Sequence, residues 1–428
     1  MQKTFFKCII IIFSTQGVVD HYGLLPRHFI YLAHILIMGN FLYLLLCDLY
    51  RILHRKKIIL YNTVDKILVF FFAFGIILIF LKNVNFLTGA IGVKNLLMFP
   101  MIYFIIRRTK ALKLEEVLNF YLKIFLFQIP VIFFQGITTN WDDEMLTGTL
   151  GYHTTGINGV IYSAIASLGI VQYFIMKKRN SLYLILFLII PGISGVRASF
   201  LLLSIVALII GFYYLIFLKK KGVFLIKGLI LFFLVFNIVD YTHLAIEKVK
   251  ISTLYKNRFS EIMRQQIYGY GIKGSNDDIT NFGRISSLIF VWNNLSKQNN
   301  FLFGNGPGLA RDSLFGKSIK IDQGFKFSGS PGGVATIWYE WGTCGIIIYL
   351  LMATISCFII FFKALKFKLL NINPYVLWSF IISALFILGN FYTTLWHTYA
   401  AFHFWLIMGF ITLNIDNSII NSFQVNRK

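Results

Sequence analysis

The chain has 428 residues, of which 57% are hydrophobic and only 13% are charged. A soluble globular domain carries about 25% charged residues, so this composition excludes an ordinary soluble fold. The net charge of +23 does not indicate nucleic-acid binding, because much of it falls in short basic clusters beside apolar segments. Such clusters mark the cytoplasmic ends of membrane spans. The clusters are Arg51/His54/Arg55/Lys56/Lys57, Arg107/Arg108/Lys110, Lys177/Lys178/Arg179, Lys219/Lys220/Lys221 and Lys363/Lys366/Lys368.

Apolar stretches of about 20 residues recur along the chain, which predicts an all-α polytopic membrane protein with about twelve transmembrane helices. The first apolar run has no small-residue cleavage site after it, so we interpret it as a retained span rather than a signal peptide. The segment 181–194 is short enough to be re-entrant. Placing the basic clusters inside makes both termini cytoplasmic. The predicted spans are 4–19, 29–48, 64–82, 86–106, 116–136, 158–176, 181–194, 198–218, 222–239, 334–362, 374–391 and 397–414.

These spans divide the chain into three parts. Residues 1–239 form spans 1 to 9 with short loops, residues 240–333 form a large external loop, and residues 334–428 form the last three spans and a cytoplasmic tail. A loop of this length is usually functional or disordered, and its aromatic content argues against disorder. Within it, 243–268 predicts an amphipathic helix on the membrane surface, and 284–296 predicts a second helix.

Two arginines are candidate ligands for an anionic substrate. Arg197 lies at the outer end of the 198–218 span, where the positive-inside bias disfavours a cation. A guanidinium can donate two hydrogen bonds to one phosphate, although an interfacial arginine can also pair with lipid headgroups. Arg284 carries a weaker local signal, because the loop holds other arginines. The loop contains 12 Lys and Arg against 7 Asp and Glu, which suits an anionic substrate and equally an anionic lipid.

A glycine-rich turn follows the predicted 284–296 helix. Its sequence is Phe303-Gly304-Asn305-Gly306-Pro307-Gly308, which can bring backbone amides close to a phosphate or a sugar. The alternative is an ordinary tight loop, since Gly and Pro punctuate loops everywhere. The turn is not a P-loop, because no Gly-Lys-Ser/Thr follows it.

Three further residues are candidates for substrate binding or proton transfer. Lys94 lies near the middle of the 86–106 span, too far from either end for easy snorkelling, so we expect it to contact a phosphate or a partner. His153 follows the 116–136 span and could act as a base, although a lone loop histidine is more often a bystander. Glu340 lies near the outer end of the 334–362 span, where it could pair with an arginine or activate an acceptor. The cysteines have no metal-ligand spacing, and we expect no metal and no cofactor.

The order of these motifs resembles the superfamily of O-antigen polymerases and ligases, which are integral-membrane glycosyltransferases. The resemblance covers most of the chain and includes the position of the long outer loop. The residues that carry it are Leu146-Thr147-Gly148-Thr149-Leu150-Gly151, Ser194-Gly195-Val196-Arg197, Gly283-Arg284 with Trp292, the 303–308 turn and Glu340-Trp341-Gly342.

The resemblance implies a metal-independent, inverting glycosyl transfer at the periplasmic face of the bacterial inner membrane. The donor is then an oligosaccharide on undecaprenyl diphosphate, and Arg197 and Arg284 are expected to bind the diphosphate and stabilise its departing charge. Trp292 and the turn are expected to bind substrate. Ligases of this superfamily carry a histidine shortly before the span that follows the loop. Here 327–333 has none, which favours the polymerase and leaves the general base unassigned.

The reading we adopt is a polymerase that joins lipid-linked repeat units into O-antigen or a related surface polysaccharide. Its expected partners are the lipid-linked oligosaccharide, membrane lipid and a possible chain-length regulator, with no nucleic acid. The alternatives are the ligase, with the lipid A core as acceptor, and a lipid-linked oligosaccharide flippase or other transporter. A flippase needs no large external domain, and the twelve-span facilitators place their longest loop in the cytoplasmic middle of the chain.

Overall fold

The computed structural model describes residues 2–17, 28–54, 62–109, 112–139, 146–150, 155–176, 198–216, 233, 237, 240–241, 284–310, 333–370, 373–392, 395–396 and 398–425. All regular secondary structure in these residues is helical, which confirms the predicted all-α class. The helices are α1 (Gln2–Ser14), α3 (His28–Leu53), α4 (Thr63–Leu81), α5 (Phe86–Thr109), α6 (Leu114–Thr138), α7 (Thr155–Met176), α9 (Ala198–Ile216), α12 (Arg284–Lys297), α13 (Gly333–Lys366), α14 (Pro374–Tyr392) and α15 (Tyr399–Val425).

Several of these helices have the length and apolar character of membrane spans. In the part of the chain that the structure describes, six meet both criteria: Ile30–Leu53, Thr63–Leu81, Phe86–Thr109, Leu114–Thr138, Gly333–Lys366 and Pro374–Phe391. These bounds agree closely with six predicted spans. The predicted spans 181–194 and 222–239, and most of the 240–333 loop, lie outside the described residues. The predicted 284–296 helix is present as α12.

The first helix, α1, ends at a bend at Thr15, and residues 18–19 of the predicted 4–19 span lie outside the described residues. α1 ends at Ser14, and the Gly17 N–H then donates to the Thr149 carbonyl at 2.8 Å. The Ser14 carbonyl accepts the Thr149 hydroxyl at 2.6 Å. The end of α1 is therefore fixed by tertiary hydrogen bonds that no local pattern encodes.

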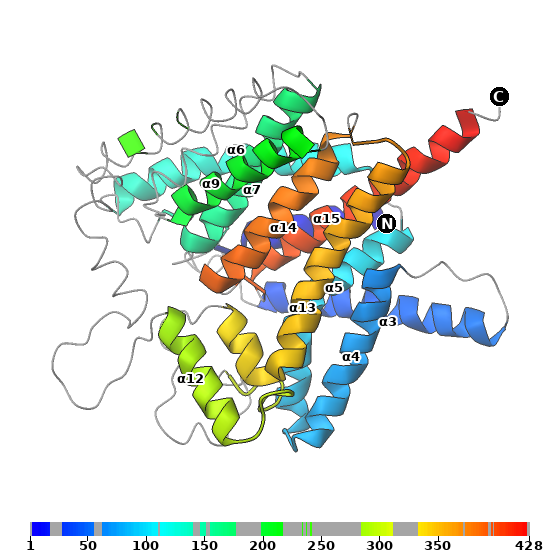
Figure 1. Cartoon of the computed structure of the whole chain (residues 1–428), viewed down its shortest axis with the longest axis vertical. Coiled ribbons are helices and arrows are strands. Elements are labelled where there is room, and N and C mark those ends of the chain that lie inside the picture. Colours follow the sequence, from blue (N-terminus) through cyan, green and yellow to red (C-terminus); the bar gives the residue numbers. More distant parts are fainter. Residues whose placement is uncertain are drawn as a thin grey trace.

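The helices pack around α14 and α15. α15 packs most extensively on α5, and α14 packs between α7 and α13 (Figure 1). The interior is strongly aromatic: Trp341, Trp378, Trp396 and Trp405 are all fully buried. Rings from three helices meet at Phe402, which stacks on Phe13 at 4.3 Å and lies 6.2 Å from Phe99.

Ion pairs gather at one end of the bundle. They join the helix pairs α1–α6, α3–α5, α4–α5 and α13–α15. Contacts of α15 show that the pairs lie at the same end: Thr412 hydrogen-bonds Tyr103, one turn before Arg107 on α5, and Asp416 pairs with Lys363. This end therefore collects Arg51, Arg107, Arg108 and Lys363 from three of the predicted cytoplasmic clusters. The pairs are Lys3–Glu116, Arg51–Asp48, Arg108–Asp48, Arg107–Asp65, Arg108–Asp65 and Lys363–Asp416.

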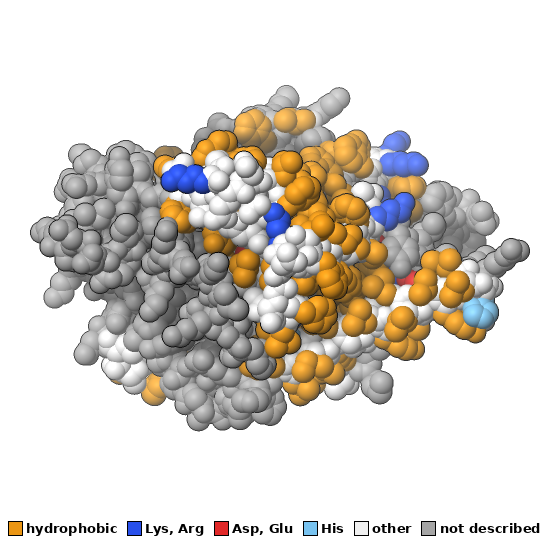
Figure 2. Space-filling view, turned by 90° about the horizontal axis from the view of Figure 1, so that it is seen from below, with side chains coloured by type: hydrophobic (Ala, Val, Ile, Leu, Met, Phe, Trp, Pro, Cys, Tyr) orange, Lys and Arg blue, Asp and Glu red, His pale blue; other side chains and the backbone are white. Residues whose placement is uncertain are grey.

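The opposite end of the bundle carries α12, the first part of α13 and the connection between α4 and α5 (Figure 1). Figure 2 views the molecule from this side. Apolar side chains cover much of the described surface there, with isolated Lys and Arg side chains among them. The residues that bear the sequence motifs near 304 and 340 meet at this end.

Candidate functional site

The site is built around a break in a membrane-length helix. α13 is interrupted at Gly342, whose φ of 67° and ψ of −171° are not helical. In a continuous helix, the N–H groups of Thr343 and Cys344 would bond the carbonyls of Tyr339 and Glu340. The break therefore frees two donors and two acceptors. In apolar surroundings each unpaired backbone group costs several kcal/mol, so a broken helix of this kind needs replacement partners.

The glycine-rich turn and the two residues before it supply all four replacement partners. The Thr343 N–H donates to the Phe301 carbonyl at 3.0 Å and the Cys344 N–H to the Leu302 carbonyl at 3.1 Å. In return, the Tyr339 carbonyl accepts from the Asn305 N–H and the Glu340 carbonyl from the Gly306 N–H, both at 2.9 Å. Four backbone hydrogen bonds therefore hold the turn and the two residues before it against α13.

Glycines permit this close approach. Gly304 has φ +67°, and a Cβ on it would lie 2.5 Å from the backbone of Glu340. On the other side of the turn, Gly92 of α5 faces Gly308, and a Cβ on Gly92 would lie 2.2 Å from the Gly308 nitrogen. Larger residues at these positions would separate the two backbones. The turn is therefore held between α5 and the broken α13.

A row of amide side chains fixes the turn to the connection between α4 and α5. The Lys82 ammonium donates to Asn300 Oδ1 at 2.6 Å, and Asn300 Nδ2 donates to Asn305 Oδ1 at 3.0 Å. Asn305 Nδ2 then donates to Asn294 Oδ1 on α12 at 3.2 Å. This row links Lys82, at the end of α4, to a stretch of chain that lies more than 200 residues later and contains both α12 and the turn.

Glu340 lies beneath the turn, only 2% exposed. Its Oε1 accepts the Ala310 N–H at 3.1 Å, immediately beyond the turn. A buried carboxylate is costly unless hydrogen bonds satisfy it. This contact gives Glu340 a positioning role, in which it holds the chain that leaves the turn.

Trp292 fixes α12 to the first part of α13. Its ring packs edge-to-face against Phe301 at 4.8 Å and Trp338 at 5.8 Å, and Phe301 and Trp338 pack together at 5.7 Å. Such pairs add about 0.5–1.5 kcal/mol each beyond their buried area. One side of Trp292 remains open, since the residue is 51% exposed. An indole held rigidly with an open side is suited to contact a sugar or a lipid.

Lys94 lies elsewhere. It faces α3, with its ammonium 6.0 Å from the centre of the Tyr31 ring. Gly92, two residues earlier on α5, faces the turn, and two residues correspond to roughly 200° around a helix. The structure therefore separates Lys94 from the Gly304–Gly308 turn, although both were predicted to bind substrate.

The 146–150 motif forms a second polar turn. Gln135 bonds both the N–H and the carbonyl of Gly148, at 2.8 and 3.1 Å. Gln128 accepts the Thr149 N–H at 2.6 Å, and Asn158 donates to the Thr147 carbonyl at 2.9 Å. Two glutamines of α6 thus hold this turn against the end of α1 and the start of α7.

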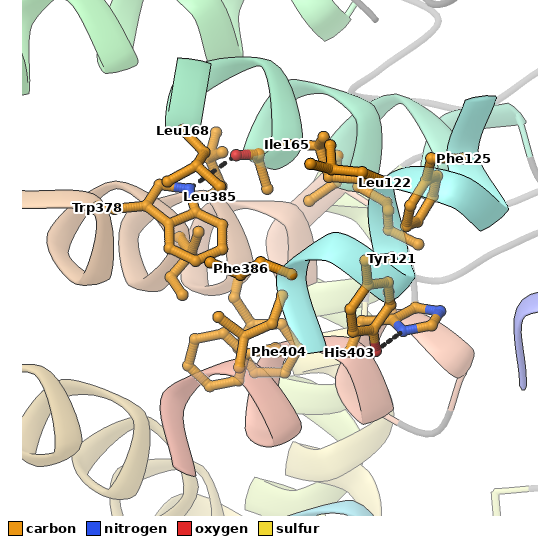
Figure 3. Close-up of a pocket in the computed structure, with 17 residues that line it drawn as sticks. Tyr121, Leu122, Phe125, Ile165, Leu168, Trp378, Leu385, Phe386, His403 and Phe404 are labelled. Carbon is orange, nitrogen blue, oxygen red and sulfur yellow. Dashed lines mark hydrogen bonds between the residues drawn. The ribbon is translucent and has the colours of Figure 1, made fainter. Parts of the chain in front are cut away.

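An apolar pocket lies between α6, α7, α14 and α15 (Figure 3). Its polar features are the Tyr121 hydroxyl, 2.6 Å from His403 Nδ1, and the Trp378 indole N–H, which donates to the Ala164 carbonyl at 2.8 Å. None of its lining residues belongs to α12, α13 or residues 301–310. The pocket is therefore separate from the site.

The predicted site residues fall into three groups. The structure brings together Glu340, Trp292 and the turn residues Gly304, Asn305, Gly306 and Gly308. Arg284 is the first residue of α12, eight residues before Trp292 in the sequence. Lys94 is placed apart from them. Arg197 and His153 lie outside the described residues. Sequence reasoning missed Lys82, Asn294, Asn300 and Gly92, because their roles depend on contacts between distant segments.

No protein-family model matches the chain, and no curated protein matches it significantly.

Proposed function

We propose that this chain is a polymerase that joins oligosaccharide repeat units carried on undecaprenyl diphosphate. The observation that carries the proposal is the convergence of three separate motifs: α12 with Trp292, the turn at 303–308 and Glu340 meet at one end of an apolar bundle. These are residues on which the resemblance to the polymerase and ligase superfamily rests. A polar, rigid site at the end of apolar helices suits a substrate with a lipid tail and a polar head.

In the proposed reaction, an acceptor hydroxyl attacks the anomeric carbon of the donor sugar from the side opposite the lipid diphosphate. The new glycosidic bond forms with inversion, the bond to the diphosphate breaks, and the lipid diphosphate leaves. Arg197 and Arg284 bind the diphosphate and stabilise the charge that develops on it. Trp292 and the turn bind the glycan, and Glu340 keeps the turn in place. No metal takes part, so polymer formation should persist in EDTA.

In the proposed membrane arrangement, the chain has about twelve spans, lies in the bacterial inner membrane and has both termini in the cytoplasm. The end that carries the turn then faces the periplasm, and the ion-paired end faces the cytoplasm. This arrangement follows the positive-inside bias, because Arg51, Arg107, Arg108 and Lys363 lie at the ion-paired end. Reporter fusions at Lys273 and Lys297 should read periplasmic, and a cytoplasmic signal at either would contradict the placement of the site.

The proposed function is tested with arginine variants in a strain that makes the polysaccharide. Arg197→Ala and Arg284→Ala should each abolish the polymer ladder on a gel while the protein stays in the membrane. Losing a charge-assisted contact to a diphosphate costs about 1.5–3 kcal/mol, roughly ten- to a hundredfold in rate. Arg197→Lys should also be impaired, because an ammonium cannot replace the guanidinium fork. A normal ladder from both alanine variants would refute the proposal.

Polymerase and ligase are separated by what accumulates after deletion, when the product is O-antigen. Loss of a polymerase leaves lipid A core capped by a single repeat unit, because a separate ligase still acts. Loss of a ligase leaves bare core and long chains on undecaprenyl diphosphate. Bare core together with accumulated polymer would assign this chain to the ligases.

A further inference from the structure

The contact between α3 and α5 holds a cation for which the described residues show no ion-pair partner. Lys94 lies on α5, roughly 12 Å along the helix from Phe86 at 1.5 Å per residue. The ion pairs formed by the described residues all lie at the other end of the bundle, and none includes Lys94. A charged group at this depth is costly and is retained where it has a function.

An imidazole faces the same space. His34 follows Tyr31 by one turn of α3, and its ring lies 6.1 Å from the Tyr31 ring, which the Lys94 ammonium approaches to 6.0 Å. The imidazole also stacks on Phe13 at 5.7 Å. Its Nδ1 is buried and has no hydrogen-bond partner among the described residues. An ammonium is a hydrogen-bond donor, and an imidazole donates through Nδ1 in the tautomer that carries its proton there. Among the described residues, neither Lys94 Nζ nor His34 Nδ1 has an acceptor. The acceptor that would satisfy both is an anionic oxygen.

Lys94 lies at nearly the same position along α5 as the contact between α5 and the turn. Gly92 packs against the turn, and Lys94 lies about 3 Å further along α5 on nearly the opposite side. The turn and Lys94 therefore flank one helix at almost the same level. On α3, Leu32 and Ile35 directly follow Tyr31 and His34 in the sequence and are 49% and 66% exposed, which gives a hydrocarbon chain an apolar surface to lie on.

We propose that Lys94 and His34 bind the diphosphate of a second polyprenyl-linked glycan, the acceptor, while the donor binds on the turn side of α5. This inference rests on the proposed function, because a polymerase takes both of its substrates as lipid diphosphates. Because the two sites lie at one depth on opposite faces of α5, both lipid tails can remain in the bilayer. The two glycans can then meet at the periplasmic end of α5.

The test counts bound lipids on the full chain. Native mass spectrometry of the protein in detergent, titrated with glycan-free undecaprenyl diphosphate, should show two bound copies. Lys94→Met should lose one copy, with its affinity weakened about tenfold or more. His34→Phe should weaken the same copy. Lys123→Met, which removes an exposed lysine from α6, should keep both copies.

Two further measurements keep the result interpretable. Lys94→Arg keeps the charge and should keep the second copy, which separates a lost ligand from a misfolded variant. Phosphatidylglycerol, which carries a single headgroup phosphate, should not displace the Lys94-dependent copy. Two copies bound by Lys94→Met, or equal occupancy by phosphatidylglycerol, would overturn the inference. Since binding is measured without turnover, failure to detect polymer would refute the proposed function and leave this count unchanged.

Discussion

The two ends of the bundle differ in the partners that their buried polar groups bond. At one end charges are neutralised by other charges: Asp65 and Arg108 are almost fully buried and ion-paired. At the other end the protein uses neutral partners, since backbone groups freed at Gly342 bond the turn and amides join α12 to Lys82. An end whose charges are already matched is suited to hold helices together. At the turn end, the charged groups Lys82 and Glu340 bond neutral partners. Under the proposed function, Lys94 on the other side of α5 is then left to bind an anionic ligand.

The largest expected effect on stability comes from removing a buried carboxylate at the ion-paired end. Asp65→Ala should lower the free energy of unfolding by about 3–5 kcal/mol, because it leaves the Arg107 guanidinium buried without its carboxylate. Asp65 also caps α4 by bonding the Asn62 N–H at 3.0 Å, and that contact would be lost as well. Denaturant titration in mixed micelles measures the change. A stable variant that makes no polymer would instead assign a direct function to this end.

The next largest effect comes from a substitution that separates the turn at 303–308 from α13. Gly304→Val should cost about 1–3 kcal/mol from backbone strain at positive φ, and the overlap with the Glu340 backbone adds to that. Polymer should be lost, because the turn can no longer bond the broken helix. Gly39→Ala is the matched control, since a Cβ there meets no atom within 4 Å. Equal activity of the two variants would show that the turn does not need its close approach.

The sequence predicted much of this fold, because its signals are local. Apolar length and flanking charge located α3, α4, α5, α6, α13 and α14 within a few residues. The Gly-Asn-Gly-Pro-Gly turn and Glu340 were recognised as motifs, but their contact was not predictable. It depends on the break at Gly342, and Trp341-Gly342-Thr343 looks like ordinary helix interior in an apolar run. The separation of Lys94 from the turn likewise depends on which face of α5 packs against which neighbour.

A smaller effect tests how α12 is attached. Trp292→Ala removes two ring contacts, with Phe301 and Trp338, and should cost about 1–3 kcal/mol. Trp292→Phe keeps a ring in place and should retain most of that stability. If Trp292 also contacts the glycan, Trp292→Phe should weaken polymer formation more than it weakens folding. Comparing denaturant titrations with polymer ladders for both variants separates the two roles.

The smallest expected effect shows that burial, and not charge alone, distinguishes the two ends. Lys3 and Glu116 form an ion pair at 3.4 Å, at the same end as Asp65, but their side chains are 62% and 44% exposed. Water and salt screen such a pair, which contributes about 0–1 kcal/mol. Lys3→Met should therefore leave both the unfolding midpoint and the polymer ladder close to wild type. A loss of unfolding free energy comparable to that of Asp65→Ala would mean that exposed ion pairs stabilise this end as much as buried ones do. The two ends would then differ in their number of ion pairs and not in the burial of those pairs.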